Sequence, residues 1–228
     1  EVARVFKEEL GFDEVITLQN EEITGEYLAL LPYRLQSKLE ENDRLVFYFA
    51  GHGVKQNDKG YLLTGDAKNW EQGFPMASLV TGLDQTQVKQ VLFVLDVCHS
   101  GLGIPIQTRS GLDEPMPGHW KELSDKHRFV ILSAGSDKEQ VIDNYKGPDG
   151  DKLPHGLFTY WLLDGLRGNA DLGDKDGFIT DVELYTHISN KVPVEAGRLN
   201  RKQNPLYASQ GEGRILFHNP NIQNVKQV

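Results

Sequence analysis

An α/β fold with a mainly parallel central sheet is predicted by two long apolar runs and by the helix-like segments around them. The runs are Arg44–Ala50 and Val91–Leu95, which are rich in valine, leucine and phenylalanine. Such runs are typical of strands that are buried on both faces, as at the centre of a parallel sheet. At 228 residues, the chain has the length of one α/β domain.

The segments before the first run show helix and strand patterns in turn. Glu1–Leu10 has its apolar residues on one face and is followed by glycine, which predicts an amphipathic helix that ends there. Asp13–Leu18 is predicted to be a short strand. Thr24 is a suitable N-cap for a helix that runs to about Leu39 and is kinked at Pro32.

Shorter elements and three irregular segments are predicted between and after the two runs. Strands are expected at Tyr61–Leu63, Phe129–Ser133 and Arg214–Phe217, and helices at Leu83–Gln90, His155–Leu166 and Asp181–Val192. Loops are expected at Asn69–Met76, Gly101–His127 and Lys146–Pro154. A loop as long as Gly101–His127 is usually functional or mobile in a compact domain.

Composition argues against several classes of protein. The net charge of −9 disfavours a nucleic-acid partner, which would require a basic face. The sequence contains neither an apolar stretch of membrane-spanning length nor a signal-peptide pattern. A single cysteine cannot form an internal disulfide, so we expect a reducing compartment and a cytoplasmic location.

Each apolar run ends in small polar residues that include a reactive side chain. Cys98, the only cysteine, follows Val91–Leu95 closely, and His52 follows Arg44–Ala50 between two glycines. If these strands are parallel neighbours, thiol and imidazole emerge at the same edge of the sheet, where open α/β sheets bind ligands. A cysteine beside a histidine is a candidate nucleophile with its general base. The alternatives are a buried structural cysteine and a surface histidine.

The sequences YFAGHG, at 48–53, and DVCHSG, at 96–101, together resemble the caspase-like cysteine peptidases, most closely their metacaspase and bacterial branch. The resemblance extends to Tyr207. It implies a caspase-like three-layer α/β/α sandwich, a Cys98–His52 dyad, and an oxyanion hole formed by the backbone N–H groups of Gly53 and Cys98. We expect a peptidase domain at 1–217 and a tail or linker at 218–228.

The resemblance also implies the specificity of the pocket. Alternation along the strand predicts that Asp96 and Cys98 point to the same side. In metacaspase-like enzymes the matching aspartate selects arginine or lysine before the scissile bond, and caspases proper have glutamine there. The alternative for Asp96 is a structural carboxylate that accepts hydrogen bonds from backbone N–H groups.

Two further segments are assigned roles by the resemblance. A substrate strand is expected to pair with the segment that consists of Ser133, Ala134, Gly135 and Ser136, although an ordinary strand-end turn is the alternative. Caspase-like enzymes often cut themselves after the nucleophile, and Arg109 has small neighbours that suit such a cut. The alternative is a covering loop that is never cut.

An acidic stretch after the last long loop is similar to part of a calcium loop. Asp174, Asp176 and Glu183 have the right spacing, but the first ligand position is Leu172, and Asp171 is one residue out of register. The favoured interpretation is an acidic loop that caps the helix starting near Asp181, with no metal or other cofactor required. Calcium binding is the alternative.

The sequence therefore predicts a cysteine endopeptidase that cleaves proteins or peptides after arginine or lysine. The alternatives are a peptidase with another preference, a catalytically silent domain that binds partners, and a calcium-sensing module. Because the family has a strand before its first helix, we expect an N-terminal strand to be missing from this sequence. An N-terminal segment or regulatory domain would fill the open sheet edge.

Overall fold

The two apolar runs form neighbouring parallel strands at the centre of a six-stranded sheet with the order β3-β2-β1-β4-β5-β7. The computed structural model describes residues 1–57, 59–97, 120–136, 139–148, 155–173 and 175–222. The strands are β1 (Arg44–Gln56), β2 (Lys59–Leu63), β3 (Phe74–Pro75), β4 (Gln90–Val97), β5 (Arg128–Ser133), β6 (Phe178–Thr180), β7 (Leu206–Gln210) and β8 (Leu216–His218). The helices are α1 (Val2–Arg4), α2 (Gly25–Gln36), α3 (Met76–Asp84), α4 (Trp120–Ser124), α5 (Leu157–Asp164) and α6 (Asp181–Arg198).

Short helical turns of other types accompany them. They are η1 (Val5–Glu9), which continues α1, η2 (Asn20–Glu22), η3 (Trp70–Gln72) and η4 (Gly165–Asn169), which continues α5. In the large sheet β1, β4 and β5 are parallel, and β2, β3 and β7 are antiparallel to their neighbours. A small second sheet pairs β6 with β8.

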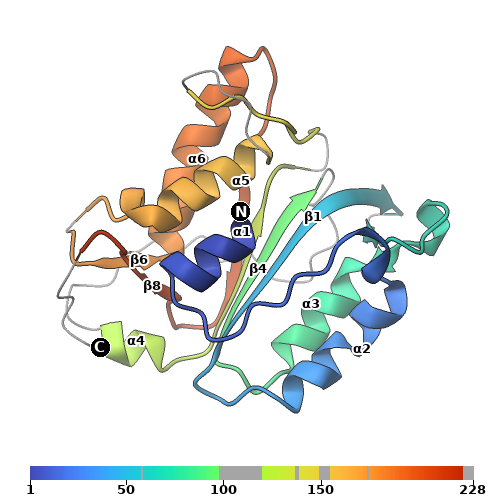
Figure 1. Ribbon diagram of the computed structural model, residues 1–228, viewed down its shortest axis with the longest axis horizontal. Helices are drawn as coiled ribbons and strands as arrows, with labels where there is room; N and C mark the ends of the chain where they lie inside the picture. Colours follow the sequence, from blue (N-terminus) through green and yellow to red (C-terminus); the bar gives the residue numbers. More distant parts are fainter. Residues whose placement is uncertain (58, 98–119, 137–138, 149–154, 174, 223–228) are drawn as a thin grey trace.

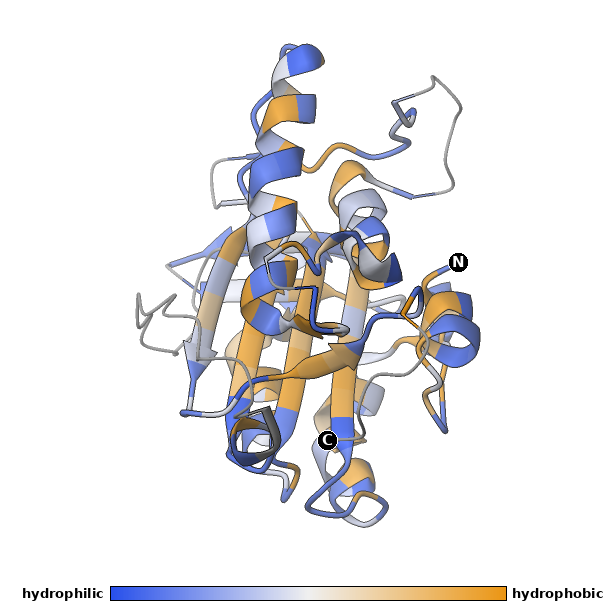
Figure 2. Ribbon diagram, turned by 90° about the vertical axis from the view of Figure 1, so that its left-hand side faces the viewer, coloured by the Kyte–Doolittle hydropathy of each residue, from blue (hydrophilic) through white to orange (hydrophobic). Residues whose placement is uncertain are grey.

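Strand β4 separates two hydrophobic cores because its side chains alternate between the two faces of the sheet. Leu92 and Val94 pack into the core beneath α5 and α6. Val91, Phe93, Leu95 and Val97 pack into the core beneath α2 and α3. All eight residues of β4 are buried, as the unbroken apolar run predicts. Figure 2 shows the apolar colour along the central strands.

Helices cover both faces of the sheet (Figure 1). Helices α2 and α3 lie on one face, and α1, α5 and α6 lie on the other. This arrangement confirms the predicted α/β sandwich with a parallel centre. Among the described ranges, none of the helices is both long enough and apolar enough to cross a membrane.

Three predicted elements differ in the structure. Asp13–Leu18 was expected to be a strand, but it belongs to neither sheet of the described residues. The helix expected at Leu83–Gln90 lies earlier, at Met76–Asp84, so the predicted loop Asn69–Met76 instead contains η3 and β3. Strand β1 does not stop at Ala50 but continues to Gln56, because its last five residues pair with β2.

A buried ion pair fixes the start of α6 against the sheet. Arg128, the first residue of β5, lies 2.8 Å from Asp181 Oδ2, and both side chains are buried. Asp181 also accepts hydrogen bonds from the Tyr207 hydroxyl and the Ile215 N–H. A buried charge needs partners of this kind, so the pair locks α6 to β5 and β7.

Candidate active site

The register of β1 and β4 fixes where the parallel pairing of these two strands ends. Gly51 on β1 is the partner of Val97 on β4, and the parallel pairing ends there. The next residue of β1 is His52, which is exposed and pairs with Leu63 of β2. Cys98 follows Val97 directly in the chain but lies outside the described residues, as does Arg109.

Side-chain alternation assigns His52 and Asp96 to the same face of the sheet. Val46 and Tyr48 of β1 contact the core beneath α5 and α6, as Leu92 and Val94 of β4 do. Continuing the alternation along β1 assigns His52 to this face. The same alternation along β4 assigns Asp96 to it, and the contact of Asp96 with α5 agrees with that assignment.

Asp96 is held by a chain of hydroxyl groups that starts on β1. The Thr159 hydroxyl, on α5, donates to Asp96 Oδ2 at 2.5 Å. It lies 2.6 Å from the Tyr48 hydroxyl. Because Thr159 has one hydroxyl proton and gives it to Asp96, Tyr48 must be the donor in the second bond. Asp96 Oδ1 is buried and has no hydrogen-bond partner among the described residues.

The Asp96 carboxyl is unusually hard to ionise. Burial and, to a lesser extent, the negative charge of Asp143 raise its pKa, whereas the hydrogen bonds from Thr159 lower it, and the net result is a pKa of about 6. Burial also raises the pKa of Tyr48, and the charge of Asp96 adds to that effect. Carboxyls with such environments are enriched at functional sites, although structural networks also produce them.

Much of the backbone of the Ser133–Ser136 segment already has hydrogen-bond partners. The Ala134 N–H donates to Leu95 O at 2.8 Å, and Ala134 O accepts from Gln203 Nε2 at 3.0 Å. Gly135 O accepts from the Ser133 hydroxyl, and the Ser136 N–H donates to the Glu139 carboxylate. A substrate strand that pairs here would have to use other backbone groups or displace these partners.

The acidic stretch before α6 is described except for Asp174. Glu183 forms a capping box with Thr180, whose N–H and hydroxyl donate to Glu183 Oε2 at 2.8 and 2.9 Å. Asp176 accepts from the Phe178 N–H, and Asp171 Oδ2 accepts from the Gly177 N–H. Within the ranges listed above, no group of three acidic, cysteine or histidine side chains is arranged to hold a metal ion.

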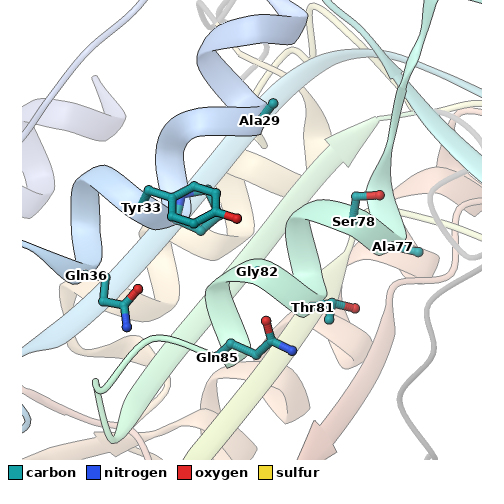
Figure 3. A pocket seen from close by; sticks show the side chains of 9 residues that line it. Ala29, Tyr33, Gln36, Ala77, Ser78, Thr81, Gly82 and Gln85 are labelled. Carbon is teal, nitrogen blue, oxygen red and sulfur yellow. The ribbon is translucent and has the colours of Figure 1, made fainter.

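A hollow of about 500 Å³ lies between α2 and α3, which cover the face of the sheet opposite to α5 and α6 (Figure 3). The labelled side chains of Tyr33 and Gln36 come from α2, and those of Ser78 and Thr81 come from α3. None of its lining residues is a predicted site residue.

Sequence reasoning did not single out three residues that act on Asp96, which are Thr159, Tyr48 and Asp143. Thr159 and Tyr48 were assigned only to a predicted helix and a predicted strand. The packing of α5 on the sheet brings the Thr159 hydroxyl to Asp96 and the Tyr48 hydroxyl to Thr159. Asp143 lies in a segment without helix or strand, so no periodicity marked it. Thr159 could have been noticed as a polar residue directly after the apolar residues Leu157 and Phe158 in the first turn of α5.

Comparisons with known proteins agree with this fold. The family model described as the caspase domain matches residues 1–214. The crystal structure of protein GSU0716 from Geobacter sulfurreducens is similar, with a TM-score of 0.55 and 19% identity over 93% of this chain and 81% of that one. A search among curated proteins found no match. Since the family model spans residues 1–214 of 228, the chain belongs to the caspase-domain family of peptidases, which act on protein substrates.

Proposed function

We propose that this protein is a cysteine endopeptidase that cleaves its substrates after arginine or lysine, with Cys98 as nucleophile and His52 as general base. The observation that carries the proposal is the register in which Gly51 pairs with Val97. His52 follows Gly51 on β1, and Cys98 follows Val97 in the sequence. This register supports the proposal that the two side chains emerge at the edge of the sheet where α/β proteins bind ligands.

The chemistry is acyl transfer in two steps. His52 takes the thiol proton, and the thiolate sulfur bonds to the scissile carbonyl carbon as the C=O electron pair moves onto oxygen. The backbone N–H groups of Gly53 and Cys98 stabilise that oxyanion. The intermediate expels the amine, which receives its proton from His52. A water deprotonated by His52 then hydrolyses the thioester and releases the carboxylate product.

Asp96 supplies the negative charge of the specificity pocket in this proposal. Its Oδ2 is held by Thr159, which leaves Oδ1 as a buried acceptor without a partner among the described residues. A buried acceptor of this kind is costly unless a donor satisfies it. A guanidinium or ammonium group of the substrate would satisfy it and would favour the ionised carboxylate.

The test compares fluorogenic peptides that differ only in the residue before the cut. We expect cleavage after arginine and lysine and none after aspartate. Cys98→Ala and His52→Ala should each lower kcat by several orders of magnitude, because nucleophile and base act as a unit. His127→Ala is the control, since His127 is exposed and precedes β5 at the opposite end of the sheet. Cleavage by Cys98→Ala at the wild-type rate would contradict the proposal.

A further inference from the structure

Two carboxylates converge on Gly156 just before α5. The position that a Cβ atom would take on Gly156 is 3.5 Å from Asp96 Oδ2 and 3.6 Å from Asp143 Oδ1. Asp96 belongs to the central strand β4, whereas Asp143 lies in an irregular segment. The two acids are 47 positions apart in sequence, so only the tertiary structure brings them together.

The segment that carries Asp143 is tied to the start of α5 by its backbone. The Leu157 N–H donates to Ile142 O at 2.9 Å, and the Tyr145 N–H donates to His155 O at 3.3 Å. On its other side, the Ile142 N–H donates to the buried Gln203 side chain at 2.9 Å. Asp143 is therefore held in place on both sides although its own side chain is exposed.

The lack of a side chain at Gly156 allows this close approach. A Cβ atom there would lie 2.9 Å from Ile142 O, which is a backbone atom and cannot move aside without shifting the Asp143 segment. Gly156 itself has an ordinary φ of −76° as the N-cap of α5. The glycine is required by the space between these elements and not by its own backbone conformation.

The two carboxylates differ in depth. Asp96 is 8% exposed, with one oxygen held by Thr159 and the other buried without a partner among the described residues. Asp143 is exposed and lies close enough for its charge to act on Asp96. The charge of Asp143 opposes the ionisation of Asp96, as like charges do. A cation that enters from outside would remove that repulsion.

We propose that Asp143 is a second specificity residue, which together with Asp96 forms a pocket that prefers arginine to lysine before the scissile bond. This inference rests on the proposed function. A guanidinium is planar and has five N–H donors, so it can bond to a deep and a shallow carboxylate at once. An ammonium group is a compact charge and satisfies mainly one of them.

The experiment measures kcat/KM for arginyl and lysyl peptides with the wild type, Asp143→Asn and Asp125→Asn. Asp125 is the matched control because it is also exposed but precedes β5, at the opposite end of the sheet. Asp143→Asn should lose about tenfold on arginyl peptides, the expected effect of one charged hydrogen bond. It should lose less on lysyl peptides, and Asp125→Asn should change neither.

A binding measurement separates the pocket from the chemistry. In the Cys98→Ala background, calorimetry with the arginyl peptide should give a Kd that rises about tenfold on adding Asp143→Asn. The matching peptide with citrulline, which is neutral, should be insensitive to that change.

The outcomes are distinguishable. If Asp143→Asn and Asp125→Asn have equal effects on arginyl and lysyl peptides, the role of Asp143 is wrong while the proposed function stands. If Cys98→Ala binds the arginyl peptide through Asp143 but the wild type cleaves nothing, the pocket stands and the proposed function is wrong. If the wild type neither binds nor cleaves arginyl peptides, both are overturned.

Discussion

Thr159 on α5 donates a hydrogen bond of 2.5 Å to Asp96 on β4, and this bond joins the amino end of a helix to the carboxyl end of the central strand. The helix end favours a negative charge near it. Burial disfavours the same charge and has the larger effect, because the pKa of Asp96 is raised to about 6. The ionised Asp96 carboxylate therefore lowers the free energy of unfolding.

That cost predicts that Asp96→Asn stabilises the fold at neutral pH. The folded-state pKa of about 6 exceeds the ordinary value of 3.8, so between these values the folded protein binds more protons than the unfolded one. Stability must then fall as pH rises through this window, and the full penalty is present above pH 6. The shift corresponds to about 2–3 kcal/mol as an upper limit.

Urea denaturation at pH 4 and pH 7.5 measures this effect. Asp96→Asn should exceed the wild type in unfolding free energy at pH 7.5 by more than at pH 4. Asp125→Asn, an exposed substitution of the same kind, should differ little at either pH. A less stable Asp96→Asn at pH 7.5 would mean that the carboxylate has a structural role.

Thr159→Val should raise the pKa of Asp96 above about 6. The substitution removes the hydroxyl that lowers this pKa and leaves the burial that raises it. Loss of a buried hydrogen bond should also cost about 1–3 kcal/mol of unfolding free energy. Thr86→Val is the control, because the buried Thr86 hydroxyl donates to Leu83 O at 2.7 Å and does not contact Asp96.

An NMR titration of the aspartate carboxyl carbons separates the two variants. Both should be less stable than the wild type, but only Thr159→Val should move the Asp96 titration to higher pH. An unchanged Asp96 titration in Thr159→Val would show that the hydroxyl does not support the ionised form.

Arg128→Ala should lower the unfolding free energy by about 3–5 kcal/mol, because it leaves Asp181 buried without its cationic partner. Arg198→Ala provides the comparison. Arg198 is also paired, to Glu195 at 2.5 Å, but it is largely exposed, so its loss should cost about 0–1 kcal/mol. Thermal and urea unfolding of both variants measure the difference. Equal losses would mean that the Arg128–Asp181 pair does not anchor α6.

Self-processing is predicted at Arg109, which lies outside the described residues. The reason is local sequence: Thr108, Ser110 and Gly111 are small and allow the chain to lie extended in a cleft. Mass spectrometry should detect a new terminus at Ser110 in the wild type and not in Cys98→Ala. Incubation with and without Ca²⁺ also tests whether the acidic loop before α6 affects processing. An intact chain in an otherwise active enzyme would leave a loop that is never cut.

The sequence alone determined the centre of the sheet. The runs Arg44–Ala50 and Val91–Leu95 were predicted to be strands buried on both faces. Every residue of the second run is buried in β4, whereas in the first run only Phe49 is buried and the other apolar side chains are half-buried or exposed. The predicted parallel pairing of these strands is confirmed, and the positions of His52 and Cys98 directly after the paired residues could be taken from the sequence. An acidic loop was predicted to cap the helix near Asp181, and the structure forms this cap with the Thr180–Glu183 capping box, whose contacts span only three residues.

Contacts between distant segments were decided only by the tertiary structure. Asp13–Leu18 has a strand-like sequence, but a strand needs a neighbour for its backbone hydrogen bonds, and none of the described strands pairs with it. Strand β1 continues past Ala50 because β2 pairs with its last residues. Asp143 lies near Asp96 because the carboxylates of both residues approach Gly156 at the start of α5. Local periodicity does not predict such contacts between distant segments, because they depend on how strands pair and how α5 packs on the sheet.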